Sequence, residues 1–390
     1  MPCPAAKFLH VIFFLVTAGW AANHFAAVLV ALKERAHLEP LLVNGAYGIY
    51  AAGLFPCLLA GGILADRFGG RPIVIAGTIV SALGNLGLAF SHSAAALLSG
   101  RFVVGLGVGL VVSAGTAWAA RLRGAQGATL AGIFLTSGFA LGPIFSGIFA
   151  YAQSRIWELY AVKFALSLLA IVVSLVIGDT PHHAVTQGPD GPAPAPAAAP
   201  AQRSSTKALA TALPVAVWVF ASITTAVVGL AARVAHYFPT GVFMPGIAAV
   251  LGFGTALVLQ ALGRRFDWGP RAGVIGALCS ATVLAIAGFA GTNPTLAAFV
   301  AATIALGAAY GLCLRDGLLD VDTYAPLHAR GRVLGIYYVG TYIGFALPPL
   351  LQWLEPLAGP TVPLLVLAAL ALTSAVVRFT QIKTGYLSRA

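Results

Sequence analysis

The chain has 390 residues and a formal net charge of +11; 59% of its residues are hydrophobic and only 8% are charged. Soluble globular proteins carry about a quarter charged residues, so this composition excludes an ordinary soluble domain. In a soluble protein the positive charge would suggest nucleic acid, but in a chain this apolar it indicates the cytoplasmic loops of a membrane protein. We therefore expect membrane lipid, and no nucleic acid, around most of the chain.

Apolar runs of about 20 residues, the length at which a helix crosses a bilayer, recur along the whole chain. They predict an all-α polytopic membrane protein with twelve transmembrane helices, the first of them retained and not cleaved as a signal peptide. The expected spans are 8–32, 41–65, 73–91, 94–119, 125–151, 156–178, 208–234, 238–262, 272–291, 295–314, 330–354 and 360–378.

The basic residues predict the orientation of these spans. If both termini are cytoplasmic, most of the 22 Lys and Arg residues lie on the cytoplasmic side, as the positive-inside rule requires. The basic residues expected outside are Lys33, Arg35, Arg155, Lys163 and Arg233. The Ala- and Gly-rich composition fits a bacterial inner membrane, where we expect a monomer.

The first span contains one titratable group, His24. Imidazole titrates at about pH 6.5 in water, so small environmental changes would gate its protonation and make His24 a proton carrier. The alternative is an ordinary hydrogen-bonded packing residue beside Trp20 and Asn23.

A polar segment, Gly61–Pro72, joins the second and third spans. Gly69 and Gly70 allow the positive φ that a chain reversal needs, and Pro72 suits the first turn of a helix. The charged residues of the segment are Asp66, Arg67 and Arg71.

The pattern Gly-x-Leu-Ala-Asp-Arg-x-Gly-x-Arg in this segment resembles the signature loop of the major facilitator superfamily of secondary transporters. The resemblance implies two six-helix pseudo-symmetric bundles and a gating role for Asp66, Arg67 and Arg71. We expect Asp66 to lie near the start of the eleventh helix, around residues 328–333, where the helix dipole favours an anion.

The fourth span places a charged residue, Arg101, in the apolar and Gly-rich stretch Ser99–Gly109. A charge at that depth is costly in lipid, so Arg101 should face the bundle interior or water. The arrangement resembles the fourth-helix Arg and Gly motif of the superfamily, which implies a part in proton coupling. The alternative is that Arg101 snorkels to the outer interface.

The fifth span carries a Gly- and Pro-rich pattern that allows close helix approach and a bend. Its residues are Gly138, Gly142, Pro143 and Gly147. The pattern resembles the fifth-helix motif of the drug/proton antiporter branch, with Ser146 in place of one glycine, and so implies export. Ordinary helix packing is the alternative.

A Pro/Ala-rich stretch at 179–207 cannot form a packed helix and predicts a flexible cytoplasmic linker. It divides the chain into bundles at 1–178 and 208–390. The bundles look related, since Phe139-Ala-Leu-Gly-Pro143 matches Phe345-Ala-Leu-Pro-Pro349. Parallel repeats of this kind are typical of transporters with a substrate site between two halves.

The tenth span is followed by Arg315, Asp316 and Asp320. If the helix continues, Asp316 and Asp320 share a face and Arg315 can pair locally. A position near the cytoplasmic end favours an ion-pair gate, and a proton-coupling role for Asp316 is the alternative.

The resemblance implies a cavity lined by the first, fourth, fifth, seventh, tenth and eleventh helices. Aromatic and hydrogen-bonding residues available to line it include Trp20, Asn23, Tyr310, Tyr338 and Tyr342. With few charges available, such a cavity favours a small hydrophobic or amphipathic solute.

The four cysteines, Cys3, Cys57, Cys279 and Cys313, lack metal-ligand spacing, and three of them fall within spans. Phosphate-binding loops, zinc-protease motifs and nucleophile elbows have no match in a usable context. We therefore expect no metal, no cofactor and no enzymatic activity.

Three function classes follow. The first is a proton-driven exporter of a small amphipathic compound, with protons and that compound as partners. The second is a metabolite facilitator or importer that does not use protons, favoured by the lack of a carboxylate in the first helix. The third is a membrane sensor or scaffold with the same fold and no flux.

Overall fold

The computed structural model describes residues 4–91, 93–152, 155–177, 203–239, 241–289, 291, 293–326 and 329–388. Within these ranges the regular secondary structure is entirely helical. Twelve of the described helical stretches are long and apolar enough to cross a membrane, which confirms the expected fold class. The chain is therefore a multi-pass membrane protein.

The α-helices are α1 (Pro4–Asn23), α2 (Phe25–Arg35), α3 (Pro40–Phe68), α4 (Gly70–Phe90), α5 (Ala94–Tyr151), α6 (Ile156–Ile177), α7 (Ser205–Thr224), α8 (Ala231–Val234), α9 (Met244–Arg265), α10 (Arg271–Phe289), α11 (Leu296–Tyr324), α12 (Arg330–Tyr342), α13 (Leu347–Ala358) and α14 (Thr361–Lys383). Most of the twelve candidate membrane spans begin and end close to the expected ones. The fourth and fifth expected spans are one assigned helix, α5, with no loop between them. The predicted linker, 179–207, falls largely outside the described residues, and α7 begins at Ser205, inside its predicted end.

Three of the spans are broken near their middle. The first span joins α1 and α2 through a turn at His24. The seventh continues from α7 through a π-helical turn, η1 (Thr225–Leu230), into α8. The eleventh joins α12 and α13 through a 3₁₀ turn, η5 (Ile343–Ala346). Such interruptions often mark functional positions in membrane helices.

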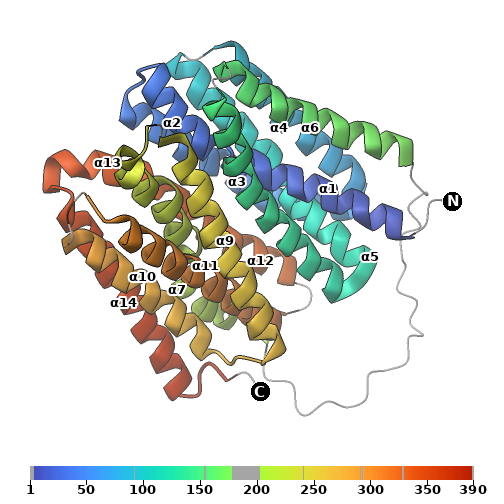
Figure 1. The fold of residues 1–390 in the computed structure, drawn as a ribbon. Coiled ribbons are helices and arrows are strands. Elements are labelled where there is room, and N and C mark those ends of the chain that lie inside the picture. Colours follow the sequence, from blue (N-terminus) through green and yellow to red (C-terminus); the bar gives the residue numbers. More distant parts are fainter. Residues whose placement is uncertain are drawn as a thin grey trace.

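The helices form two bundles that lie side by side (Figure 1). In the first bundle, blue to green, α5 packs against α1, α3 and α4; in the second, yellow-green to red, α11 packs against α7, α9 and α10. Small residues make these crossings close: a Cβ added at Gly105 would lie 2.1 Å from the Tyr50 carbonyl oxygen, and one at Gly307 would lie 2.3 Å from that of Gly252. Packing through small residues is the usual way membrane helices associate.

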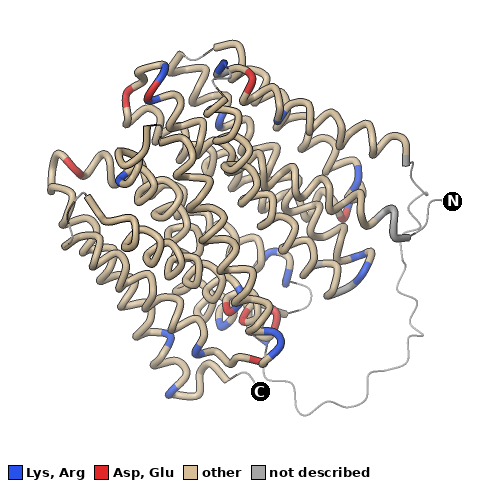
Figure 2. The backbone as a smooth tube through the Cα atoms, viewed as in Figure 1, with Lys and Arg blue, Asp and Glu red and all other residues tan. Residues whose placement is uncertain are grey.

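The charged residues gather toward the two ends of the bundles, with long uncharged stretches between them (Figure 2). We call the end that carries the 66–71 and 265–271 loops the hinge end, and the end that carries the 36–39 and 359–360 loops the opposite end. Large apolar side chains such as Phe90, Ile63 and Val176 are 82%, 70% and 79% exposed, as expected for surfaces that face lipid.

Candidate substrate path and coupling groups

A layer of aromatic rings fills the middle of the interface between the bundles. Phe220 of α7 packs against Phe139 of α5 and Tyr342 of α12, with ring centroids 5.6 and 4.3 Å apart. Tyr47 of α3 stacks on Phe345 of η5 at 5.2 Å. We define the aromatic layer as Tyr47, Tyr50, Phe139, Phe220, Phe253, Tyr310, Tyr342 and Phe345, all at most 3% exposed.

The predicted cavity residues divide into two groups. Tyr310 and Tyr342 belong to the aromatic layer, and Asn23 borders it, because its Nδ2 donates to the Phe139 carbonyl at 2.9 Å. Trp20 instead stacks on Phe145 at 5.1 Å. Tyr338 packs on the ring of Tyr337 and also lies near Tyr310 and Tyr342 of the layer.

Four residues of the layer were not predicted to lie at the interface: Phe139, Phe220, Phe253 and Phe345. A signal for two of them was present, since Phe139 and Phe345 open the repeated Phe-Ala-Leu-x-Pro motif. The structure brings these two repeat-related rings to the same partner, Phe220, at 5.6 and 4.9 Å.

His24 lies at the break of the first span and is fully buried. Its Nε2 is 3.1 Å from Asn85 Oδ1 of α4, and its ring meets Tyr160 of α6 edge-on at 5.9 Å. Within the described residues, Nδ1 has no hydrogen-bond partner. His24 therefore packs among helices of its own bundle, away from the aromatic layer.

Arg101 is also fully buried inside the first bundle and does not reach its surface. Its Nε donates to the Ala46 carbonyl at 3.3 Å and its Nη2 to the Ala22 carbonyl at 3.4 Å. The guanidinium lies over the rings of Phe25 and Tyr50, 4.4 and 4.7 Å from their centroids. Because Tyr50 belongs to the aromatic layer, Arg101 is one side chain away from the interface.

Lys163 is a third buried base of this bundle. The charge distribution predicted Lys163 at the outer face, but its side chain is buried among the helices, 1% exposed, and Nζ donates to Ser167 Oγ at 2.7 Å. Arg101 and Lys163 both lie near enough to His24 to act on it electrostatically. We call His24, Arg101 and Lys163 the basic cluster. No carboxylate among the described residues forms an ion pair with any of them.

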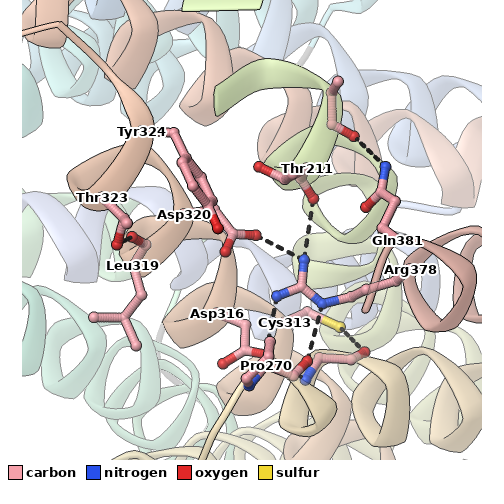
Figure 3. Close-up of polar contacts among 12 residues, drawn as sticks. Thr211, Pro270, Cys313, Asp316, Leu319, Asp320, Thr323, Tyr324, Arg378 and Gln381 are labelled. Atoms are coloured by element: carbon pink, nitrogen blue, oxygen red, sulfur yellow. Dashed lines mark hydrogen bonds and ion pairs between the residues drawn. The ribbon is translucent and has the colours of Figure 1, made fainter. Parts of the chain in front are cut away.

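Asp316 and Asp320 lie inside the second bundle and bind one arginine, Arg378 of α14 (Figure 3). Its Nη2 is 3.0 Å from Asp316 and its Nη1 is 2.7 Å from Asp320. Arg315 pairs with the other oxygen of Asp316 at 2.9 Å, as the local pairing predicted. We call Arg315, Asp316, Asp320 and Arg378 the charge network.

Among the described contacts, the charge network joins four helices of one bundle. Arg378 also donates to the Thr211 carbonyl of α7 at 3.0 Å, and the Gly273 amide of α10 donates to Asp316 at 2.6 Å. Because the network neutralises the charges, α11 continues through them to Tyr324, whereas the expected tenth span ended at 314.

The residues expected to gate the hinge end make contacts within the first bundle. Asp66 pairs with Arg121 at 3.1 Å, with side chains 77% and 41% exposed. Arg71 donates to Ser174 of α6, and Arg67 lies over the Phe68 ring. Residues 329–333 of the expected Asp66 neighbourhood are described, and no ion pair or hydrogen bond joins Asp66 to them. Residue 328 lies outside the described residues, and the nearness of Asp66 to this helix start stays a prediction.

The glycines of the fifth span lie where α5 crosses its neighbours. A Cβ at Gly138 would lie 2.2 Å from the Val16 carbonyl oxygen of α1, and one at Gly142 would lie 2.9 Å from that of Trp20. Gly147 faces the second bundle, where an added Cβ would lie 2.9 Å from the Val242 carbonyl oxygen. The motif thus forms one close crossing inside the first bundle and another between the bundles.

Polar contacts hold the bundles together toward the opposite end. Asn44 Nδ2 of α3 is 3.3 Å from Gln352 Oε1 of α13, and the Gly241 amide is 3.4 Å from Glu34 Oε1 of α2. Tyr151 of α5 also packs against a ring of the second bundle. At the hinge end, by contrast, the ion pair between Asp66 and Arg121 stays within one bundle.

Comparison with known proteins identifies relatives among transporters. Over 162 residues the chain is 28% identical to the proton myo-inositol cotransporter of Homo sapiens, an alignment that covers 39% of this chain and 24% of that protein. Over 132 residues it is 29% identical to the quinolone resistance protein NorA of Staphylococcus aureus, covering 33% of this chain and 34% of NorA. Over 64 residues it is 36% identical to the multidrug resistance protein MdtL of Klebsiella pneumoniae, covering 16% of each.

Each of these alignments spans well under two thirds of the relative's own length. The fold is similar to that of a POT family transporter crystallised with 5-aminolevulinic acid, with a TM-score of 0.75 over 97% of this chain and 96% of that one at 14% identity. The family model of the Major Facilitator Superfamily matches residues 9–349. The twelve-helix architecture and this match show that the chain belongs to the Major Facilitator Superfamily, a family of membrane transporters.

Proposed function

We propose that the chain is a proton-driven exporter of a small hydrophobic or amphipathic compound that works by alternating access. The observation that carries this proposal is the crossing made by Gly138, Gly142 and Gly147, where α5 touches both α1 and the second bundle. The motif resembles that of drug/proton antiporters, and two relatives are named for drug resistance. Close contact through glycines lets the bundles rotate against each other without large side chains in the way.

The aromatic layer supports an apolar or amphipathic substrate. Its rings offer large apolar faces, and the polar groups beside them are few: the hydroxyls of the tyrosines and the side chain of Asn23. Sites of this composition bind solutes through apolar contact, with a few hydrogen bonds that fix the orientation. A sugar or a polyanion would need more polar or basic groups along the path.

Proton coupling needs a group whose protonation differs between the two facing states. His24 fits this role because it lies at a helix break, is buried, and interacts with Arg101. Asp316 and Asp320 are the second pair of candidates, but each is held by Arg378 in this structure. We therefore assign proton transfer to His24, with Arg101 tuning it through their mutual repulsion.

The gates follow from the two ends of the molecule. Asp66, Arg67 and Arg71 control the hinge end, and release of the contact between Asn44 and Gln352 opens the opposite end. We place the hinge end in the cytoplasm of a bacterial cell with both termini, and we infer a monomer. The two bundles correspond to residues 1–178 and 208–390, joined by the linker 179–207.

The alternative function is a metabolite facilitator or importer that is not coupled to protons. The specific observation in its favour is that the expected first span, 8–32, contains no carboxylate, the acid that drug antiporters often carry in that helix, and that no carboxylate among the described residues pairs with the basic cluster. The human relative is named for inositol and protons, which shows that transporters similar to this chain differ in substrate.

The first test is flux in proteoliposomes under an imposed pH gradient, after a thermal-shift screen has found a stabilising compound. Export coupled to protons predicts that substrate efflux acidifies the compartment left by the substrate and stops when the gradient is removed. Flux that ignores the gradient in the wild type would establish the facilitator instead.

The second test identifies the proton carrier. His24→Gln should lose gradient-driven flux and retain substrate exchange at equal pH, whereas His236→Gln, which changes an exposed histidine, should behave as wild type. The combined change Asp316→Asn with Asp320→Asn tests the second carrier in the same way. Driven flux that survives His24→Gln would rule out His24.

A further inference from the structure

A cavity of about 250 Å³ lies between the bundles toward the opposite end, away from the aromatic layer. It is lined by Lys33 and Asn44 from the first bundle and by residues of η1, α8, α13 and α14 from the second. The broken seventh span forms one wall, because η1 contributes Thr225, Val228 and Gly229. Of these lining residues the proposed transport mechanism uses only Asn44 and Gln352, whose contact closes the opposite end.

The polar groups of the cavity form a chain that crosses the interface. Lys33 Nζ is 3.5 Å from Asn44 Oδ1, and Asn44 Nδ2 is 3.3 Å from Gln352 Oε1. Gln352 Nε2 is 3.5 Å from Glu355 Oε2, at the far end of the chain. These hydrogen bonds are long and therefore weak, so the polar groups of the chain can still form stronger hydrogen bonds with a ligand.

The cavity carries more positive than negative charge. Two cations, Lys33 and Arg233, line it together with one carboxylate, Glu355. Arg233 donates to the carbonyls of Ala287 and Gly291, both at 3.2 Å. Within the described residues, the ammonium of Lys33 has the Asn44 amide oxygen as its hydrogen-bond acceptor and forms no ion pair. Lys33 is thus the group best placed to take an anion.

The rest of the wall is apolar. Leu347, Leu351 and Leu364 line the cavity on the side of the second bundle. A ligand that satisfies both parts carries one anionic head, for Lys33 and the Asn44 amide, and an apolar body for the leucines. A charge-assisted hydrogen bond to the ammonium would be stronger than the long contact it replaces.

We propose that this cavity is a binding site for a small amphipathic organic anion, such as an aromatic carboxylate. The ligand's carboxylate accepts hydrogen bonds from Lys33 and Asn44, and its ring packs on the leucine wall. Because Asn44 also holds Gln352 of the other bundle, an anion bound there competes with a contact that closes the opposite end. The site stands whether or not transport is coupled to protons.

The test uses 4-(trifluoromethyl)benzoate as the probe, with its binding to the full chain in nanodiscs followed by ¹⁹F NMR. The neutral 4-(trifluoromethyl)benzyl alcohol and empty nanodiscs give the baseline for partition into lipid. The benzoate should bind the protein at least several-fold more tightly than the alcohol. Lys33→Gln should weaken benzoate binding about tenfold, and Lys33→Arg should retain it. Lys383→Gln, which removes an exposed cation at the hinge end, should change nothing.

A second variant tests the cavity itself. Gly229 lines it, and a Cβ added there meets no atom within 4 Å, so the side chain of Gly229→Leu starts in open space and takes up part of the cavity. Benzoate binding should be lost in this variant, with the melting temperature unchanged. Equal binding of the two probes would overturn the proposal, as would full binding by Lys33→Gln. Loss in Lys33→Gln with full binding by Gly229→Leu would place the anion outside the cavity and overturn it too.

Discussion

The two bundles bury charge in opposite ways. In the second bundle two arginines and two aspartates form the charge network, with ion-pair distances of 2.7 to 3.0 Å and a net charge of zero. In the first bundle Arg101 and Lys163 are buried beside His24, and carbonyl oxygens, a serine and aromatic rings take the place of carboxylates.

This difference separates two physical roles. In a neutral network every buried charge has a partner of opposite charge. Removing one member leaves another charge buried without a partner, which is strongly destabilising. A basic cluster without a carboxylate partner is held by weaker contacts, so a change in protonation or a nearby anion alters its energy strongly. We therefore assign rigidity to the second bundle and coupling to the first.

Arg378→Met should have the largest effect on stability. It leaves Asp316 and Asp320 buried with one arginine between them, which should lower the free energy of unfolding by about 3–5 kcal/mol. The measurement is thermal unfolding in detergent, and Asp320→Asn in the same chain is the control. That double variant restores neutrality and should regain most of the loss. If the single variant melts like wild type, the network does not stiffen the bundle.

Arg101→Lys should have the next largest effect and should abolish turnover. The ammonium cannot hold both carbonyls and both ring faces, so we expect a loss of about 2 kcal/mol in stability. Substrate flux in proteoliposomes is the decisive measurement. Arg123→Lys, which changes an exposed arginine at the hinge end, is the matched control. Normal flux in Arg101→Lys would show that any cation suffices at this position.

Lys163→Met should be tolerated in stability, in direct contrast to Arg378→Met. Replacing a buried cation that has no ion pair with an apolar side chain of similar length should raise the free energy of unfolding by about 1 kcal/mol or leave it unchanged. Ser167→Ala removes only the hydrogen-bond partner of Lys163. It therefore measures the contribution of the hydrogen bond to stability separately from that of the charge. If Lys163→Met lost as much stability as Arg378→Met, the two bundles would not differ in how they bury charge.

Asp66→Asn should have the smallest effect on stability and a clear effect on transport. Its ion pair with Arg121 is largely exposed to solvent, so its loss should cost less than about 1 kcal/mol. Flux should nevertheless fall sharply, because the gate at the hinge end depends on this carboxylate. Asp322→Asn breaks a comparable exposed pair with Arg330 in the second bundle and serves as the control. Unchanged flux in Asp66→Asn would remove the gating role.

The sequence predicted the spans well because their apolar runs depend on local composition alone. It also located the stretch around Gly142 that becomes a helix crossing. It did not predict that Lys163 and Arg378, placed on the outer and inner sides of the membrane, are buried, because that burial depends on how neighbouring helices pack around them. Asp316 and Asp320 were rightly expected on one helix face, but Arg378, which binds both, is 58 residues from Asp320 along the chain.

The aromatic layer shows the same limit. The repeated Phe-Ala-Leu-x-Pro motif is visible in the sequence. The packing of Phe139 and Phe345 on Phe220, however, depends on how two distant segments dock. The sequence shows no helix-breaking proline in the first and seventh spans at the points where they break. The residue at the first break is His24, and the second break, η1, contains no proline.

The breaks of the seventh and eleventh spans are joined to each other. Thr224, just before η1, donates its hydroxyl hydrogen to the Gly344 carbonyl of η5 at 3.0 Å. Amide hydrogens in regular membrane helices exchange with solvent deuterium very slowly, whereas those at a break exchange when the break moves. Amide exchange around Thr224 and Gly344 therefore reports the movement of both breaks. When substrate is added, the rate of deuterium uptake should change in the same direction at the two sites, and no label needs to be attached to the protein.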